Sequence, residues 1–297
     1  MLRHTFCHIP GVGEKTEQRL WAAGLTTWEA VLDGEPTRPS PAARCLPAAH
    51  LRESVEHYAR ANPAWFAERL PANQSWRLFH DFRGSCAYLD IETTGMAEYD
   101  QVTTIALYDG RAVRTYVQGD NLDDFARDVQ AYRLLVTFNG KSFDLPVLES
   151  RLGCRLGQAH IDLRHVLRSL DLRGGLKSCE QQLGLGRPGM EGMDGLLAVL
   201  LWREFRRRRD RLALESLLAY NVQDAVNLEA LMVHAHNRKL ARLTAVPFAA
   251  GYQLPLPAPP ANPFRVDAET VRRILRENLW LFPAERTGLP ARNDPCV

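Results

Sequence analysis

The chain has 297 residues, which exceeds the usual span of one compact domain and favours a large domain with a smaller companion. Apolar residues make up 45% and charged residues 24%, which excludes a wholly disordered chain, a collagen and a coiled-coil rod. The 37 basic and 35 acidic residues give a formal net charge of +2. Bulk charge therefore does not indicate a nucleic-acid-binding protein, and any such function must depend on local sites.

The cysteines and the N-terminus indicate where the protein works. The six cysteines are scattered, without a C-x-x-C pair or a Cys/His cluster of zinc spacing, so we expect reduced and mostly buried thiols. The N-terminus has no apolar run long enough for a signal peptide, and no stretch approaches the length of a membrane span. The sequence therefore predicts a cytoplasmic protein with no membrane partner.

Residues 1–82 are predicted to form a small all-α module. From about residue 6 to 35, a short helical lead, the turn IPGVG and two short helical stretches resemble a helix-hairpin-helix. Gly11 and Gly13 would let the backbone turn and expose N–H groups to phosphate, and Lys15 adds a positive charge there. The alternative is an ordinary glycine turn in a small helical bundle. A proline-rich break and one helix over 51–70 follow.

Residues 83–245 show an α/β order. We expect a meander of three strands within 86–119, a helix over 121–132, a strand over 133–139 and a helix over 143–153. After His160 the pattern is nearly all helical and ends in a long amphipathic stretch over 212–243. Residues 246–297 form a proline-rich tail, predicted to wrap the surface as extended chain and to end in a short helix that docks through its apolar face.

Asp90 and Glu92 flank Ile91 in an apolar strand. The period of two places both carboxylates on one face and Ile91 on the other. Two like charges on one face repel each other, and Mg²⁺ or Mn²⁺ between them would relieve the repulsion. The alternative is the end of a strand whose acids reach solvent.

Two further acidic positions stand later in the chain. Asp144 follows an apolar strand and opens a helix, so it is either a first-turn acid or a metal ligand. Tyr220 and Asp224 share a helix face at i, i+4, which is also typical of a surface pair. Asp162 is predicted to cap a helix, with an outer position at the same site as the other possibility. A phosphate loop around Gly140 is excluded, because Leu135 stands where that motif needs glycine.

Together the motifs YLDIETTG, FNGKSFDLP and Tyr-x-x-x-Asp, in this order, resemble the DEDD superfamily of 3′–5′ exonucleases and its DEDDy branch. The similarity is closest to bacterial predicted exonucleases of ribonuclease H-like fold with an N-terminal helix-hairpin-helix. The resemblance implies a ribonuclease H-like mixed sheet flanked by helices and two Mg²⁺ or Mn²⁺ ions. It also implies a set of metal-binding carboxylates and a water-orienting tyrosine, which fall on Asp90, Glu92, Asp144, Asp224 and Tyr220.

The lysines give a further indication of nucleic-acid contacts. Only four lysines stand against 33 arginines, and three of them, Lys15, Lys141 and Lys177, lie in motif-like positions. We expect these lysines, the two hairpin glycines and Asn139 to contact nucleic acid, with DNA favoured over RNA. The arginine run 206–209 and Arg211 fit either a solvated helix face or a ridge facing the substrate.

Three functions are compatible with these features. The leading one is a metal-dependent 3′–5′ exonuclease with a two-metal mechanism. The alternatives are a non-catalytic nucleic-acid-binding module of the same fold and a structure-specific endonuclease.

Overall fold

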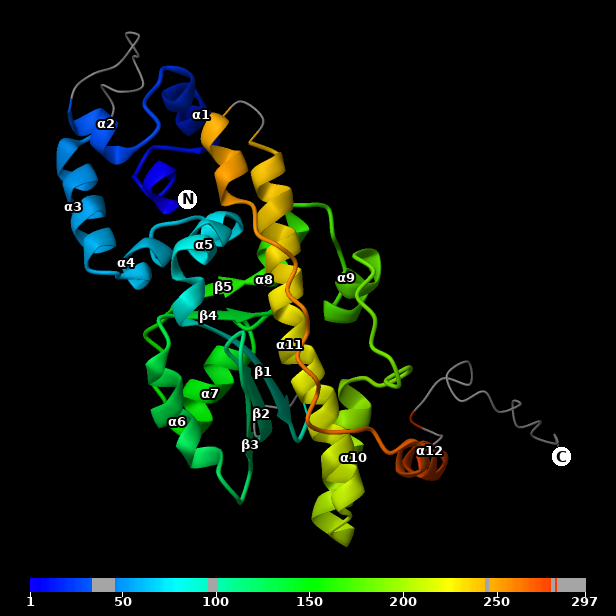
Figure 1. Cartoon of the computed structure of the whole chain (residues 1–297). Helices are drawn as coiled ribbons and strands as arrows, with labels where there is room; N and C mark the ends of the chain where they lie inside the picture. Colours follow the sequence, from blue (N-terminus) through cyan, green and yellow to red (C-terminus); the bar gives the residue numbers. More distant parts are fainter. Residues whose placement is uncertain (34–45, 96–100, 244–245, 279–280, 282–297) are drawn as a thin grey trace, which may run out of the picture.

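The computed structural model describes residues 1–33, 46–95, 101–243, 246–278 and 281, and its centre is a five-stranded mixed sheet (Figure 1). The strand order is β3-β2-β1-β4-β5. Strand β1 (Cys86–Thr93) lies in the middle, antiparallel to β2 and parallel to β4. Helices flank the sheet, which confirms the expected α/β class.

The predicted meander is present as β1, β2 (Val102–Tyr108) and β3 (Val113–Val117). The chain turns between β2 and β3 at Gly110, whose φ of +85° favours glycine. The Asp109 Oδ1 atom accepts hydrogen bonds from the backbone N–H groups of Arg111 at 3.0 Å and Ala112 at 2.9 Å. This side-chain turn fixes the register of the hairpin.

The parallel half of the sheet consists of β4 (Leu134–Thr137) and β5 (Ala159–Asp162). Every residue of β4 is buried, as expected for a strand covered on both faces. Helix α7 (Asp144–Leu152) connects these two strands. The helical stretch expected over 121–132 is present as three short pieces: η5 (Leu122–Asp124), α6 (Phe125–Asp128) and η6 (Val129–Ala131).

Between β5 and the tail, the described residues form the helices α8 (Leu163–Arg168), α9 (Leu176–Gln182), α10 (Gly195–Arg208) and α11 (Arg211–Ala241). Helix α11 crosses the sheet and packs on β1 and β2. The sequence suggested an amphipathic helix, but α11 is buried around most of its middle. The reason is that the C-terminal segment runs along its outer side (Figure 1).

The N-terminal residues are helical, as predicted, but the details differ. The elements are η1 (Leu2–His4), α1 (Glu14–Ala22), α2 (Trp28–Leu32), α3 (Ala48–Ala59), α4 (Pro63–Ala67), η3 (Ala72–Leu78), α5 (Phe79–Phe82) and η4 (Arg83–Ser85).

The prediction of a single helix over 51–70 was wrong. Helix α3 ends before Ala61, whose φ is +48°. Asn62 then caps α4 by accepting from the Trp65 N–H, and Pro63 occupies the first turn of α4.

The helical lead expected directly before the IPGVG turn is absent. The helical turn that precedes it, η1, already ends at His4. Residues 34 and 35 of the predicted hairpin, and most of the proline-rich break, lie outside the described residues.

The N-terminal module and the sheet share one hydrophobic core. A continuous cluster of buried side chains extends from Met1 through Trp76 and Leu134 to Leu228. Helix α4 packs on β5, and η3 packs on β5, α8 and α11. The separation into a module over 1–82 and a domain over 83–245 therefore describes the sequence pattern, whereas the packing is continuous.

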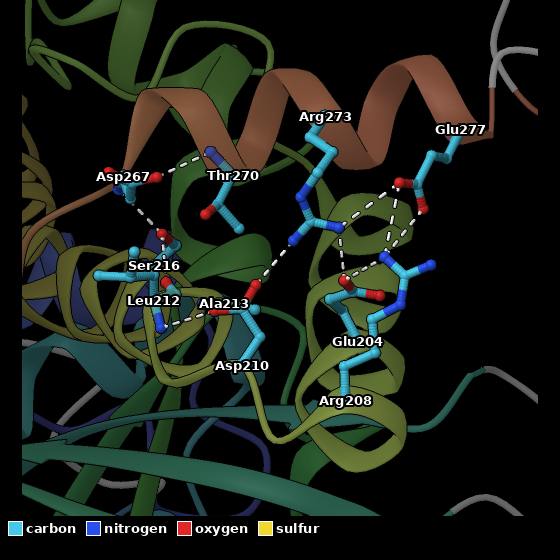
Figure 2. Close-up of polar contacts among 10 residues, drawn as sticks. All are labelled: Glu204, Arg208, Asp210, Leu212, Ala213, Ser216, Asp267, Thr270, Arg273 and Glu277. Carbon is cyan, nitrogen blue, oxygen red and sulfur yellow. Dashed lines mark hydrogen bonds and ion pairs between the residues drawn. The ribbon is translucent and has the colours of Figure 1, made fainter.

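The tail follows α11 and closes on α10. It begins with η7 (Pro247–Tyr252), runs extended and ends in α12 (Ala268–Glu277). Asn237 on α11 holds the extended part through two hydrogen bonds with the backbone of Leu254, at 2.7 and 2.9 Å. Figure 2 shows how α12 docks: Arg273 reaches Glu204 at 2.5 Å and Asp210 at 2.7 Å.

The cysteine and membrane expectations can be compared within the described residues. Cys7, Cys86, Cys154 and Cys179 are free and buried, as expected, whereas Cys45 and Cys296 lie outside the described part of the chain. None of the described helices combines the length and the apolar character needed to span a membrane.

Candidate metal centre

Three of the predicted carboxylates meet at the centre of the sheet. Asp90, Glu92 and Asp224 each offer a carboxylate oxygen, and these oxygens lie within 4.8 Å of one another. The pleat of β1 points Asp90 and Glu92 to the face that α11 covers, while Ile91 is buried on the other side. Asp224 comes down from α11.

Asp144 approaches the same strand from α7. It is the first residue of that helix, is 5% exposed, and its carboxylate accepts a hydrogen bond from the backbone N–H of Ile91. It is not within the 4.8 Å group, but its charge raises the pKa of Asp90 and of Glu92. The four predicted carboxylates thus share one electrostatic environment.

The ionised form of these carboxyl groups is unfavourable in the ion-free protein. Burial, then the charges of Asp224, Glu92 and Asp144, raises the pKa of Asp90 well above its ordinary value. Burial and Asp224 do the same for the pKa of Glu92. Burial also raises the pKa of Asp144 to about 7. Clustered oxygen donors with raised pKa values are the ligand set that a hard divalent cation such as Mg²⁺ or Mn²⁺ favours.

Asn221 is a member of the site that the sequence analysis missed. Its Nδ2 donates to Asp90 Oδ2 at 2.7 Å and to the Asp90 carbonyl at 3.2 Å. Its Oδ1 accepts from the Thr104 hydroxyl on β2 at 3.0 Å. Asn221 is fully buried and orients the Asp90 carboxylate. No local signal singled it out, because Gln223 is a second polar residue between Tyr220 and Asp224.

Arg187 was also missed, and it supplies the positive charge nearest to Asp224. Its guanidinium donates to Asp224 and makes two hydrogen bonds with Glu180, at 2.5 and 2.6 Å. Its side chain is only 9% exposed. Glu180 is fixed in turn by Asn227 on α11 at 2.9 Å. Arg187 stands in a glycine- and proline-containing loop without a recognisable motif, so no sequence pattern indicated its role.

Tyr220 and Lys177 lie beside the carboxylates. The Lys177 Nζ atom is 4.5 Å from the centre of the Tyr220 ring and donates to the Met193 carbonyl. Burial, then the charges of Asp224 and Glu92, raises the pKa of Tyr220, so its hydroxyl stays protonated. A protonated phenol at this position can donate a hydrogen bond toward the acidic cluster.

The FNGKSFDLP motif forms a tight loop between β4 and α7. Gly140 is required, because a Cβ atom there would lie 2.1 Å from Thr137 Oγ1. Asp162 caps α8, as predicted, and also accepts from the backbone N–H groups of Asn139 at 2.8 Å and Lys141 at 3.2 Å. The Lys141 side chain is exposed. Asp162 therefore shapes the loop that leads to Asp144.

The hairpin residues do not join this cluster. Gly11 has a φ of +82°, and Gly13 is the N-cap of α1, the helix that carries Lys15. Lys15 lines a cavity with Arg242, which follows the last residue of α11. Eighteen residues separate Arg242 from Asp224, which is roughly 27 Å along a helix axis.

Comparison with known proteins shows what this arrangement is related to. The family model of the RNase H superfamily matches residues 87–236, which include β1 through most of α11. An uncharacterized protein of Bacillus subtilis (strain 168), YprB, is 29% identical over 177 residues, covering 52% of this chain and 42% of YprB. This chain thus aligns with less than half of the length of that relative. No solved structure matches significantly.

The matched segment contains all five strands except the first residue of β1, and the four carboxylates of the cluster. It covers half of the chain. The chain therefore belongs to the RNase H superfamily.

Proposed function

We propose that this protein is a divalent-metal-dependent nuclease that shortens nucleic acid from its 3′ end. Members of the RNase H superfamily are typically nucleases. The observation that carries the proposal is the group of Asp90, Glu92 and Asp224, whose carboxylate oxygens lie within 4.8 Å of one another. Such a group is stable only when cations or protons reduce its charge.

The four carboxylates have the chemistry to hold two Mg²⁺ or Mn²⁺ ions. Asp90 would bridge the ions, Glu92 and Asp224 would complete one site, and Asp144 would serve the other. When bound, two such ions stabilise the charge that develops on the attacking and leaving oxygens of a phosphodiester. This division of roles rests on the resemblance to DEDDy exonucleases.

Three other side chains have roles that their contacts support, and the resemblance to DEDDy exonucleases implies a role for Tyr220. Asn221 orients Asp90 through its two hydrogen bonds. Tyr220, whose hydroxyl remains protonated, positions the attacking water. Lys177 and Arg187 balance the acidic charge and attract the phosphate. The 3′ polarity, the preference for DNA and the cytoplasmic location remain predictions from the sequence.

The test uses single-stranded DNA and RNA labelled at one end, in Mg²⁺, in Mn²⁺ or in EDTA. A 3′–5′ exonuclease converts a 5′-labelled strand into a ladder of shorter labelled products and releases a labelled mononucleotide from a 3′-labelled strand. Asp224→Ala should abolish both, whereas Asp123→Asn, at an exposed acid on η5, should leave both unchanged. Internal fragments would indicate an endonuclease. No cleavage in either metal would refute the nuclease.

A further inference from the structure

A basic cavity lies among the elements that flank the proposed metal centre. It has a volume of about 550 Å³, and its wall includes Arg164 and Arg168 of α8 and Arg173 of the following loop. Phe138 and Asn139 complete the side formed by the β4–α7 loop. The described residues that line this cavity include three arginines and no carboxylate, so its charge suits an anion.

The cavity is connected to the site through shared elements. The loop that carries Asn139 leads directly to Asp144 at the start of α7. Gly175, which also lines the cavity, is the N-cap of α9, the helix that carries Lys177 and Glu180. A phosphate held in the cavity would therefore contact the loop and the helix end that position residues of the metal centre.

A second basic cavity lies beyond the C-terminal end of α8, where Arg242 contacts the residues that follow the helix. It has a volume of about 570 Å³, and Lys15 and Arg19 give it a positive charge, while Arg242, also in its lining, is paired with Asp171. Its described lining residues likewise include no carboxylate.

Arg242 links the two cavities. Its guanidinium donates to the Ser169 carbonyl at 2.7 Å and pairs with Asp171 at 3.2 Å, both directly after α8. Ser169 and Asp171 stand between Arg168 and Arg173, which line the first cavity, so Arg242 joins the second cavity to the first at the C-terminal end of α8. The pairing with Arg242 offsets the carboxylate that Asp171 places at this junction.

We infer that these two cavities form a path that guides single-stranded nucleic acid from the N-terminal module along α8 to the metal centre. The inference rests on the proposed function and adds the route of the strand. Two basic cavities joined in succession match one phosphate backbone, whereas a duplex presents two. The half-buried Phe138 ring, in the wall of the first cavity, offers a surface on which a base can stack.

The test measures affinity with fluorescein-labelled oligodeoxythymidylates of about four and about sixteen nucleotides, which bracket common site sizes. Anisotropy is recorded in Ca²⁺, at several salt concentrations. Arg168→Glu/Arg173→Glu changes the first cavity, and Lys15→Glu/Arg19→Glu changes the second. Arg52→Glu/Arg203→Glu alters the charge equally on α3 and α10, at exposed positions outside both cavities, and is the matched control.

The path predicts a dependence on strand length. The Arg168/Arg173 variant should bind both oligonucleotides about tenfold more weakly, with a salt slope lower by about 1.4, because two phosphate contacts with a single strand are lost. The Lys15/Arg19 variant should weaken only the longer strand, and the control should change neither. Equal affinities for both cavity variants and the control would overturn the path, and tighter binding of a duplex of the same length would overturn its single-stranded character.

A separate measurement distinguishes this inference from the proposed function. Hydrolysis of thymidine 5′-(p-nitrophenyl phosphate) by the unaltered protein in Mn²⁺ tests the metal centre alone, because this small ester is too short to enter the path. If hydrolysis fails while the cavity variants lose affinity, the nuclease is refuted and the path remains. If hydrolysis succeeds and the variants bind normally, the path is refuted and the nuclease remains.

Discussion

At Asp90, the carboxyl group is held beside three other carboxylates, and its pKa is raised well above the ordinary value. Asp90→Asn removes one charge but keeps an oxygen that can accept the hydrogen bond from Asn221. We therefore expect this variant to unfold at a higher temperature than the unaltered protein in EDTA, and to lose nearly all nuclease activity. Thermal unfolding with and without Mn²⁺ measures the first effect, and strand degradation measures the second.

Asp123→Asn is the control for Asp90→Asn, because it removes an exposed carboxylate that is not part of the cluster. It should change neither the unfolding temperature in EDTA nor the stabilisation by Mn²⁺. An Asp90→Asn protein that is still stabilised by Mn²⁺ as strongly as the unaltered chain would show that Asp90 is not a ligand.

Asp144 makes the ion-free protein sensitive to pH. Its pKa of about 7 in the fold exceeds the ordinary 3.8, so the folded state holds the proton more tightly than the unfolded state. This stabilisation is fully present below about pH 4 and is lost as the pH rises to about 7. A metal ion needs the ionised carboxylate, so Mn²⁺ affinity should increase over the same range.

Calorimetric titration with Mn²⁺ between pH 6 and pH 8, in buffers of different ionisation enthalpy, checks the dependence on Asp144. The unaltered protein should release protons on binding, and fewer should be released at the higher pH. Asp144→Asn should bind more weakly and release fewer protons at pH 6. Proton release that does not differ between the two proteins would contradict the assignment of this pKa.

Arg187 is the internal counter-charge of the cluster. In the ion-free protein, Arg187→Met leaves Glu180 and Asp224 buried without their cation, which should lower the free energy of unfolding by about 3–5 kcal/mol. Mn²⁺ can replace part of that charge at Asp224. The increase in unfolding temperature on adding Mn²⁺ should therefore be larger in Arg187→Met than in the unaltered protein, and an equal or smaller increase would argue against this role.

The sequence predicted the candidate metal-binding carboxylates more readily than the residues that hold those carboxylates in place. Asp90 and Glu92 could be placed on one face because the strand period is local and fixed. Asn221 and Arg187 act through contacts with residues distant in sequence, and no local pattern marks such contacts. Asp162 could be predicted as a helix cap, but its second role, holding the β4–α7 loop, depends on how β4 and β5 pair.

Among the elements, α12 provides a direct test of how the tail is held. Ile274 is 2% exposed in the core formed with α10 and α11, so Ile274→Ala should lower the free energy of unfolding by about 2–5 kcal/mol. Arg273→Ala removes ion pairs to Glu204 and Asp210. Because the Arg273 guanidinium is partly exposed, the free energy of unfolding should fall by only about 1 kcal/mol. Urea unfolding measures both, with the exposed Arg272→Ala as the control. A larger loss for Arg273→Ala than for Ile274→Ala would mean that charge, not packing, docks the helix.

The elements show where sequence patterns fail. The meander and the late helices have the strong periodicity that predicts them, and their positions were correct within a few residues. The helix expected over 51–70 divides because Asn62 and Pro63 begin a new helix, which the apolar spacing alone did not reveal. Helix α11 was expected to have one exposed face, because the sequence does not show that the tail covers it.

At the scale of the whole molecule, the continuous core implies one cooperative unit. Glu17 and Arg77 form an ion pair inside the N-terminal part, with side chains 1% and 2% exposed and a shortest distance of 2.6 Å. Glu17 also accepts from the backbone N–H groups of Phe6 and Cys7. Glu17→Ala therefore leaves a buried cation without its carboxylate and two N–H groups without their acceptor, which should cost about 3–5 kcal/mol.

The location of that loss shows how the molecule unfolds. Tryptophan fluorescence mainly reports residues 1–82, which contain four of the six tryptophans, whereas far-ultraviolet circular dichroism is dominated by the long helices α10 and α11. If the core is shared, both signals should show the same urea midpoint, and Glu17→Ala should shift both midpoints equally. Two separate midpoints, with only the fluorescence signal shifted, would instead support the independent N-terminal module that the sequence pattern indicated. In that case the path along α8 would join two bodies that can move relative to each other, and the affinity for long strands should fall at urea concentrations that leave the circular dichroism unchanged.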